Sequence, residues 1–448
     1  LYAGSDDGTV YMTVDDGKTW TNITSRFPNR PKNPYVSGLV ASAVDERTVY
    51  VAFDNHTNDD YNNHLYASVD GGNNFRSISE GLPKGQVVMT VAEDPKNPAV
   101  LYAGTEFGLF VSTDRGGNWN RIRSGLPTVP IHEIVFHPRE NDMIVGTHGR
   151  SIWILDDATP IQQSAEAMRA DAFLFDMRQA MQFNPANNRG FVTDKPFRGR
   201  NPTFGAALSY YLKGPANDVS LRIRDAGGTV VREITGNDLD DARKAGINRV
   251  HWDLRHQPLA PVAGLPTGGP GGGGGGAGGG GAGGPGNNNG PFVMPGEYQV
   301  TLVVGGRDVA SKPVRVIGDT AVQMTDADRK TWHDTALAFH RLQAVANEAA
   351  EAVIKLGEQH SALEGLLKLA ASTPAEAKTA VGAADKQLSE LRRRLGVPAP
   401  GQPATGGGGG GGGGFGGQQQ NVRGQIGQTK GQIMNSHSLP SEQQLRVL

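Results

Sequence analysis

The sequence predicts a mainly β protein that ends in a pair of helices, and three observations support this prediction. An eight-residue pattern, Ser/Thr-x-Asp-x-Gly-x-Thr/Asn-aromatic, recurs at 13–20, 68–75 and 112–119. Short segments of alternating apolar residues then fill much of 170–317. After Thr325 the apolar period becomes helical, with apolar residues recurring three, four or six positions apart.

Each copy of the repeated pattern follows an apolar strand signal and precedes another short β-like stretch, which is the layout of a hairpin. Asp accepts backbone N–H bonds in such a turn, and Gly takes the positive φ that other residues resist. The aromatic residue then returns to the core. We therefore expect structural roles for nine residues, namely Asp15, Gly17 and Trp20, Asp70, Gly72 and Phe75, and Asp114, Gly116 and Trp119.

The spacing of the three copies is that of propeller blades. The Asp positions recur at intervals of roughly 45 to 55 residues, with several strand signals in each interval. A fourth unit, 131–157, alternates like a strand pair but lacks the pattern. We expect residues 1–160 to form a partial β-propeller, an open arc made of the last blades of a longer chain, because the sequence begins within a strand signal.

The repeated pattern resembles the Asp-box, or BNR repeat, of sialidases, xyloglucan-degrading glucanases, photosystem II assembly factors and sortilin receptors. Residues 36–157 also resemble the last blades of large bacterial secreted proteins that are called sortilin-like or glycosyl hydrolases, through the segments 51–56, 101–108 and 145–157. In these families the box lies away from the ligand face.

The resemblance implies an exported, periplasmic or extracellular sortilin-like propeller that binds a protein, peptide or glycan ligand. Two alternatives stay open. One is a glycoside hydrolase of the sialidase or xyloglucanase type, and the other is a purely structural extracellular module. A signal peptide would lie upstream of this sequence.

Composition excludes several classes of function. The formal net charge of −2 and the pI of about 6.6 give no electrostatic basis for nucleic-acid binding. The absence of cysteine excludes disulfides and thiolate metal sites. No apolar run is long enough for a transmembrane segment.

Two further domains are expected after the propeller. Residues 170–317 predict an immunoglobulin-like β-sandwich with Trp252 in its core, interrupted by a glycine-rich loop insertion at 268–290. Glycine loses much conformational entropy on ordering, and this tract has no large apolar groups to offset the loss.

Residues 325–396 predict an α-helical hairpin with an Ala/Leu seam suited to self-association, and Gly357 marks a candidate break in its first helix. Residues 397–448 are expected to be a glycine-rich linker and a polar tail.

Two groups of residues are candidate sites. The loop 53–64 is rich in Asp, Asn and His, and Asp54, Asp59 and Asp60 make Ca²⁺ its candidate ligand; no other cofactor is evident. Glu106, His148 and Arg150 follow equivalent strand ends in consecutive units, which we expect to be inner strands facing the central channel. A carboxylate, an imidazole and a guanidinium there could bind a ligand, whereas the catalytic residues of any hydrolase stay unassigned.

Overall fold

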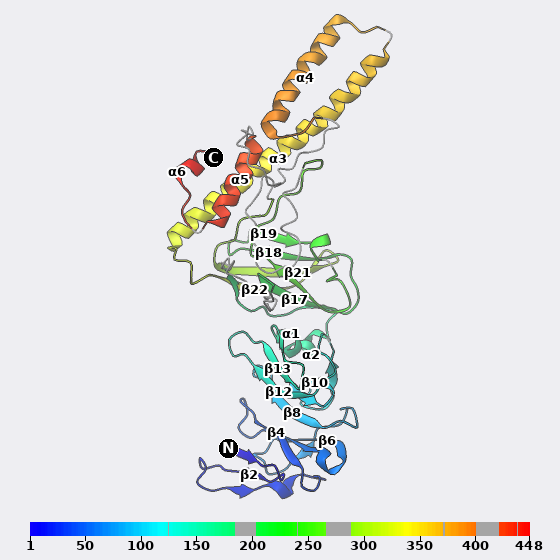
Figure 1. The fold of residues 1–448 in the computed structure, drawn as a ribbon, viewed down its shortest axis with the longest axis vertical. Helices are drawn as coiled ribbons and strands as arrows, with labels where there is room; N and C mark the ends of the chain where they lie inside the picture. The colour runs from blue at the N-terminus through cyan, green and yellow to red at the C-terminus, as the bar shows by residue number, and fades with distance from the viewer. Residues whose placement is uncertain are drawn as a thin grey trace, which may run out of the picture. The chain divides into compact units, whose positions relative to one another are not determined.

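A computed structural model describes residues 1–123, 125–183, 203–239, 241–265, 288–370, 372–399, 421–436 and 438–448 (Figure 1). Most of the predicted 268–290 insertion and the whole glycine tract 406–417 lie outside these residues. The chain divides into two compact units: unit 1 contains Leu1–Arg178, Ser209–Pro215 and Lys244–Asn248, and unit 2 contains the remaining segments. No helix in the described part is long and apolar enough to cross a membrane.

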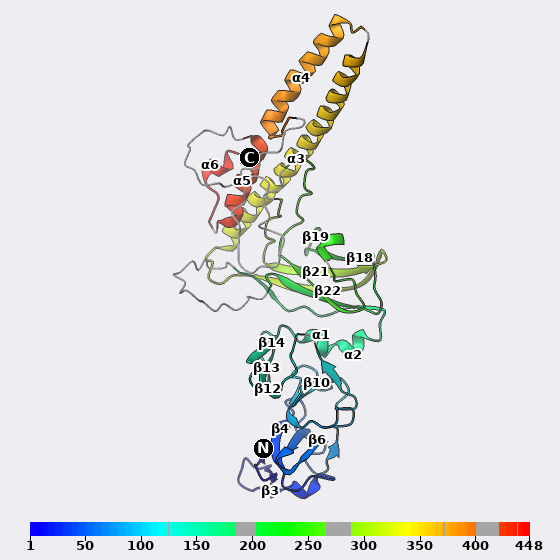
Figure 2. The ribbon, with the colours of Figure 1, turned by 45° about the vertical axis from the view of Figure 1, so that its right-hand side comes forward.

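Four antiparallel sheets make up most of unit 1, and in each sheet neighbouring strands are consecutive in sequence (Figures 1 and 2). The first sheet has three strands, β1 (Tyr2–Gly4), β2 (Val10–Met12) and β3 (Thr21–Asn22). The second has four, β4 (Tyr35–Ala41), β5 (Val49–Asn55), β6 (Asp60–Ser68) and β7 (Arg76–Ser77). The third has β8 (Val88–Glu93), β9 (Leu101–Thr105), β10 (Gly108–Ser112) and β11 (Asn120–Ile122). The fourth has β12 (Ile131–Phe136), β13 (Met143–Thr147) and β14 (Ile152–Leu155).

The four sheets are arranged like consecutive blades. The first strands β1, β4, β8 and β12 contact one another in turn, so they are the inner strands of the four sheets. Separate apolar clusters fill the spaces between the first and second, second and third, and third and fourth sheets. Consecutive meander sheets that pack face to face, with their first strands adjacent, are the arrangement of β-propeller blades.

Glycines allow neighbouring strands and sheets to approach closely. A Cβ atom on Gly104 of β9 would lie 2.6 Å from Thr90 Cγ2 and 2.7 Å from the carbonyl oxygen of Ile131. Similarly, a Cβ on Gly4 would lie 2.5 Å from a methyl group of Val36. A side chain at either position would push neighbouring sheets apart.

The three repeated turns share one hydrogen-bond pattern. The Asp114 carboxylate accepts the Ser112 hydroxyl at 2.7 Å, the Asn118 backbone N–H at 2.8 Å and the Asn118 side-chain amide at 2.6 Å. Equivalent contacts hold Asp15 and Asp70. The glycine two residues after each Asp has a positive φ, 87° at Gly17, 77° at Gly72 and 83° at Gly116. Each turn is therefore fixed by contacts that are local in sequence.

The aromatic residues of the three turns differ in burial. Phe75 stacks on Phe27 at a centroid distance of 3.9 Å, and Trp119 donates its indole N–H to the Ile78 carbonyl at 2.8 Å. Both rings thus pack against the preceding sheet. The expectation of a core position is wrong for Trp20, which is 44% exposed, because no described sheet precedes its own.

Unit 1 continues beyond the fourth sheet with two short helices and one strand, α1 (Thr159–Gln162), α2 (Ser164–Ala167) and β15 (Ala172–Leu174). A buried network surrounds α1: the Gln162 side-chain amide donates to Asp94 and to Asn141, each at 3.0 Å. These contacts tie α1 to the third and fourth sheets.

The β part of unit 2 contains a five-stranded sheet of order β16-β22-β21-β18-β19, in which β16 pairs parallel to β22. Its strands are β16 (Ala180–Gln182), β18 (Val219–Arg224), β19 (Val230–Ile234), β21 (Gly296–Val304) and β22 (Arg307–Gly318). A three-stranded sheet of order β15-β17-β20 contains residues of both units, since β15 and parts of β17 (Ala206–Leu212) and β20 (Gly246–Trp252) belong to unit 1. Trp252 is fully buried against Tyr298 at a centroid distance of 5.3 Å. The immunoglobulin-like topology stays a prediction.

The helices of unit 2 are α3 (Asp326–Leu369), α4 (Ala375–Leu395), α5 (Val422–Asn435) and α6 (Glu442–Leu445). The break considered at Gly357 is absent, since α3 continues through it; a Cβ there would lie 2.1 Å from Arg392 Nη2. The predicted polar tail contains α5, which buries Ile433 and receives the Trp332 indole N–H at the Ile433 carbonyl, at 2.7 Å. Few large apolar residues carry this packing, so the sequence signal for α5 is weak.

Candidate ligand-binding groove

The inner strands of three sheets share a backbone irregularity. The register shifts by one residue between Val36 and Gly38 in β4, between Val88 and Thr90 in β8, and between Ile131 and Glu133 in β12. The bulged residues are therefore Ser37, Met89 and His132. Bulges redirect side chains and are common beside binding sites, so their recurrence at one end of three adjacent inner strands marks this region as a candidate site.

A groove of about 410 Å³ runs along the same three strands. Its lining comes from β4, β8 and β12 alone: Ser37, Leu39, Val40, Thr90, Val91, Ala92, Glu93, His132, Glu133, Ile134, Val135 and Phe136. The Ser37 hydroxyl donates to the Val88 carbonyl at 2.7 Å and holds β4 against β8 at one end. We call this feature the inner-strand groove.

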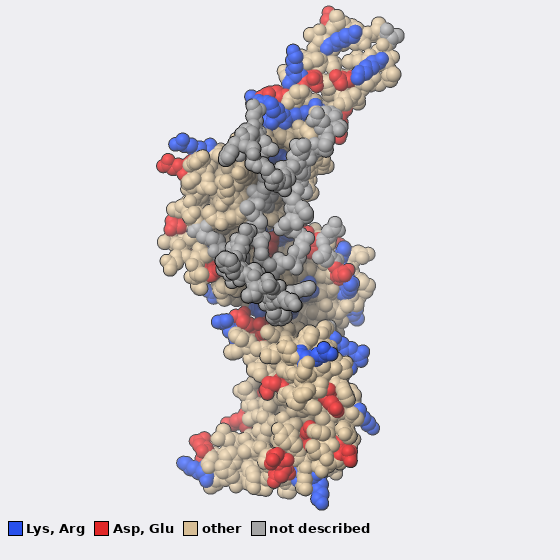
Figure 3. Space-filling model, viewed as in Figure 1, with Lys and Arg blue, Asp and Glu red and all other residues tan. Residues whose placement is uncertain are grey.

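The inner-strand groove is acidic, and most of its accessible surface is polar. Glu93 and Glu133 contribute two carboxylates, no Lys or Arg lines it, and Phe136 is its one aromatic side chain. Figure 3 shows acidic and basic side chains interspersed on the face of unit 1 that it displays. The groove therefore favours neutral or cationic ligands over anionic ones.

The structure places Glu106, His148 and Arg150 at the same end of the sheets as the bulges. Each follows the second strand of its sheet, β9 or β13, so the expectation that these are inner strands is wrong; the inner strands are β8 and β12. Sequence reveals a strand end but does not reveal which strand of a sheet faces the axis.

Only one member of this trio has a contact that links it to the groove. The His148 ring lies 5.5 Å from the His132 ring, between centroids. Glu106 and Arg150 form no hydrogen bond or ion pair with each other or with His148 in the described part of the chain. A shared binding site of these three residues stays a prediction.

The acidic loop between β5 and β6 satisfies its own carboxylates. Asp54 accepts the backbone N–H of His56 at 2.9 Å and contacts its ring Nδ1 at 2.7 Å, whereas Asp59 is exposed. Burial alone would raise the pKa of Asp60, but hydrogen bonds from Asn55 and other neighbours outweigh it and lower that pKa. No three His, Asp or Glu side chains among the described residues are placed to share a metal ion. Calcium binding by this loop stays a prediction without geometric support.

The turn carboxylates are unsuited to proton transfer near neutral pH. Hydrogen bonds from the side chain and backbone of Thr19, and from Thr13, lower the pKa of Asp15 to about 2. The pKa of Asp70 is also lowered, chiefly by hydrogen bonds from Asn74. The carboxylates of Asp15 and Asp70 are thus held ionised by their own turns, which fits a structural role.

Sequence reasoning missed the residues that line the groove, Glu93, His132 and Glu133 among them. His132 and Glu133 lie in the segment 131–136, where the alternating pattern predicted a strand but did not indicate its bulge or its inner position. The one sequence signal for the inner strands was that a strand segment recurs after each repeated turn.

Comparisons with known proteins add little to this geometry. No protein-family model matches the sequence, and no curated protein matches it. Among solved structures, YCF48 bound to D1 peptide aligns at 12% identity and a TM-score of 0.21, over 35% of this chain and 60% of that one. A GH74 xyloglucanase from Xanthomonas campestris aligns at 19% identity and a TM-score of 0.28, over 55% and 37%.

The extracellular domain of the B. thetaiotaomicron one-component system BT4673 aligns at 12% identity and a TM-score of 0.26, over 71% of this chain and 36% of that one. The chain thus spans 60% or less of the length of each of these structures. At such identities and scores, none of them bears on ligand or activity.

Proposed function

We propose that unit 1 is part of an Asp-box β-propeller and that its inner-strand groove binds an extended peptide segment with basic and apolar side chains. The observation that supports this proposal is the repeated bulge on β4, β8 and β12, beside a groove that those strands line. The three turns with their Asp and Gly pattern support the Asp-box assignment.

The lining favours a peptide over a glycan. Val135 is 48% exposed and suits an apolar side chain of a peptide, whereas Glu93 and Glu133 suit lysine or arginine. Val91 and Ile134 are buried between the sheets and do not face a ligand. A single aromatic ring, Phe136, offers little stacking surface for sugars. The lack of cysteine agrees with the proposed periplasmic or extracellular location without establishing it.

A glycoside hydrolase is the second candidate, because Glu93 and Glu133 place two carboxylates on one groove. Glycosidases use a pair of carboxyl groups, one on each side of the scissile bond. Glu93, however, accepts a hydrogen bond from the Tyr50 hydroxyl at 3.3 Å. Release of sugar by the wild type from neutral β-glucan oligosaccharides, abolished by Glu133→Gln, would replace the peptide-binding proposal with this one.

The helical hairpin of α3 and α4 supports a proposal of self-association. Several leucines near the end of α3 are exposed, namely Leu356, Leu363, Leu366 and Leu369. Light scattering of the wild type and of a variant with these leucines replaced by glutamine tests this proposal.

Peptide binding is tested by fluorescence anisotropy with two labelled synthetic peptides, one alternating Lys and Val and the other alternating Glu and Val. The cationic peptide should bind and the acidic one should not. Glu133→Gln should weaken binding about two- to fivefold, the usual size of one exposed charge contact. Glu80→Gln removes an exposed carboxylate outside the groove and should have no effect. Equal binding of both peptides, or equal loss in the two variants, would contradict the proposal.

A further inference from the structure

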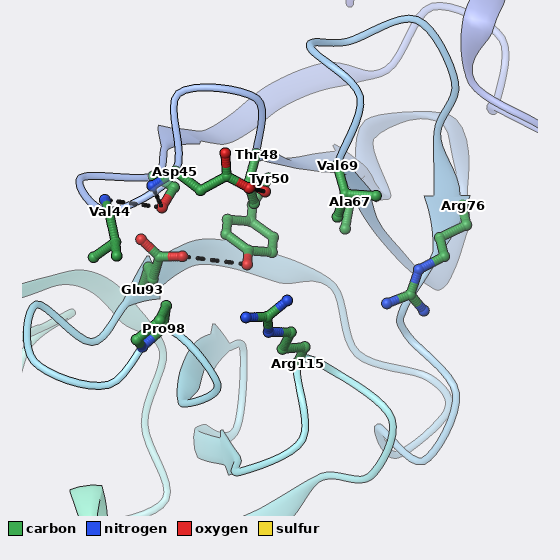
Figure 4. A pocket seen from close by; sticks show the side chains of 11 residues that line it. Val44, Asp45, Thr48, Tyr50, Ala67, Val69, Arg76, Glu93, Pro98 and Arg115 are labelled. Atoms are coloured by element: carbon green, nitrogen blue, oxygen red, sulfur yellow. Dashed lines mark hydrogen bonds between the residues drawn. The ribbon is translucent and has the colours of Figure 1, made fainter.

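A second, smaller pocket lies where the inner strands β4 and β8 end, at the opposite end from the bulges (Figure 4). It encloses about 80 Å³ between the second and third sheets. One water needs roughly 10–15 Å³ of such volume, so the pocket has room for about five to eight non-hydrogen atoms. Two exposed valines, Val44 and Val69, stand at its rim.

Two arginines line this pocket without partners. Arg76 and Arg115 are exposed, and their guanidinium groups form no hydrogen bond and no ion pair within 4.0 Å with another described residue, although the pKa of Asp45 is lowered by hydrogen bonds and, to a smaller extent, by the charge of Arg115. Figure 4 shows Arg115 extending from the third sheet towards Tyr50 and Glu93. Guanidinium groups bind carboxylates through two parallel N–H donors. Two guanidinium groups that have no protein partner and line the same pocket therefore favour a carboxylate ligand.

Arg115 occupies a backbone position that is costly for its residue type. It has a φ of 58° in the third repeated turn, where the equivalent residue of the second turn is Gly71 with a φ of 75°. Left-handed backbone at a residue other than Gly, Asn or Asp is strained, and such strain is often retained where the side chain has a function. The turn itself does not require arginine here, since Gly71 and Asp16 serve in the other two turns.

The opposite wall offers acceptors and a fixed hydroxyl. Asp45 is occupied, because it accepts the Arg47 backbone N–H at 3.1 Å and the Thr48 hydroxyl at 2.8 Å. Glu93 Oε1 accepts the Tyr50 hydroxyl at 3.3 Å, which leaves Oε2 with no hydrogen bond from a described residue. A ligand group that donates a hydrogen bond, such as a hydroxyl or an ammonium, would supply the hydrogen bond that Oε2 of Glu93 lacks.

We propose that this pocket binds a small carboxylate whose neighbouring carbon carries a hydroxyl or an amine, with Arg115 and Arg76 on the carboxylate and Glu93 on the donor group. The pocket size, the unpaired guanidinium groups and the free oxygen of Glu93 together define this class. A free α-hydroxy or α-amino acid and the corresponding end group of a larger molecule share this chemistry. The pocket adjoins the inner-strand groove at Glu93, which lines both, but neither arginine lines the groove, so substitutions of Arg76 and Arg115 test the pocket alone.

Isothermal titration calorimetry of the whole chain with L-lactate, glycine and acetate tests the proposal. Lactate and glycine should bind with dissociation constants on the order of 1 mM, reasonable for so few atoms, and acetate should bind at least tenfold more weakly because it cannot engage Glu93. Equal binding of acetate would remove Glu93 from the site and overturn the proposed ligand class. No binding of any of the three would overturn the site itself.

The decisive variant is Arg115→Gly, which gives the third turn the residue that the second turn already has. The variant should fold with an unchanged or higher melting temperature and lose lactate binding at least tenfold, and Arg76→Ala should weaken it less. Asp16→Gly makes the same backbone change in the first turn, away from the pocket, and should bind lactate as the wild type does. Undiminished lactate binding by Arg115→Gly would refute the assignment. Binding of the cationic peptide should be unaffected in all three variants, so failure of this site and failure of the groove are distinguishable.

Discussion

Replacing Lys430 by methionine should stabilise the packing of α5 on α3 at pH 7 and destabilise it at pH 10. Lys430 is fully buried; its Nζ donates to the Asn289 carbonyl at 3.0 Å and lies 3.3 Å from Nδ1 of His340. Burial, together with the charge of Arg255, lowers the pKa of Lys430 to about 7. The folded state therefore disfavours the ammonium form, which the unfolded chain keeps up to its ordinary pKa of 10.5.

The direction in which stability changes with pH follows from proton binding. Between pH 7 and pH 10.5 the unfolded state binds the extra proton, so the stability of the wild type rises with pH across that window, and the penalty is fully present below pH 7. At about 1.4 kcal/mol per pKa unit, the change is about 4 kcal/mol between pH 7 and pH 10. Methionine does not titrate, but it loses the hydrogen bonds, a constant cost of about 1–3 kcal/mol. The variant should thus be the more stable protein at pH 7 and the less stable one at pH 10.

Urea unfolding followed by ¹⁹F NMR of 5-fluorotryptophan measures this effect locally. The reporter is Trp332, whose indole N–H donates to the Ile433 carbonyl in α5, and Trp332→Phe assigns its signal. Lys355→Met, at an exposed position of α3, is the control and should show no pH-dependent difference. A stability difference between Lys430→Met and the wild type that stays the same at both pH values would refute the reasoning.

Two further predictions concern acid stability and the repeated turns. Burial lowers the pKa values of His256 and His340 to about 4, so the stability of unit 2 should fall as the pH decreases from 6.5 towards 4, and thermal melts across that window should show the loss. A flat melting temperature there would contradict it. Asp114→Ala should lower the free energy of unfolding by about 1–3 kcal/mol, because turn amides lose their acceptor, and should leave peptide affinity in the folded fraction unchanged. Lost affinity at an unchanged melting temperature would show that Asp114 belongs to a binding site.

Local features were the ones that could be predicted from the sequence. The turn of Asp114 depends on partners no more than four residues away, so the residue pattern is enough to define it. The helical hairpin likewise follows from a local period, and Thr325 caps α3 by accepting the Asp328 N–H at 3.1 Å.

Features that depend on distant partners could not be predicted. The pairing of Tyr50 with Glu93 joins two sheets, and the contact of Lys430 with Asn289 joins α5 to a loop far earlier in the chain. No residue type specifies a bulge, so His132 had no distinguishing signal. The burial of Phe75 and the exposure of Trp20 depend on whether another sheet packs on the turn. The repeated pattern carries no information about that packing.

Photo-cross-linking locates peptide binding to the inner-strand groove. The alternating Lys and Val peptide, carrying one benzophenone residue, would be irradiated with the whole chain, and the attachment sites would be mapped by mass spectrometry. Attachment within β4, β8 and β12, competed by unlabelled peptide and reduced in Glu133→Gln, is the expected result. Attachment confined to the outer strands of unit 1 or to the helices of unit 2 would contradict the assignment of the groove as the ligand site.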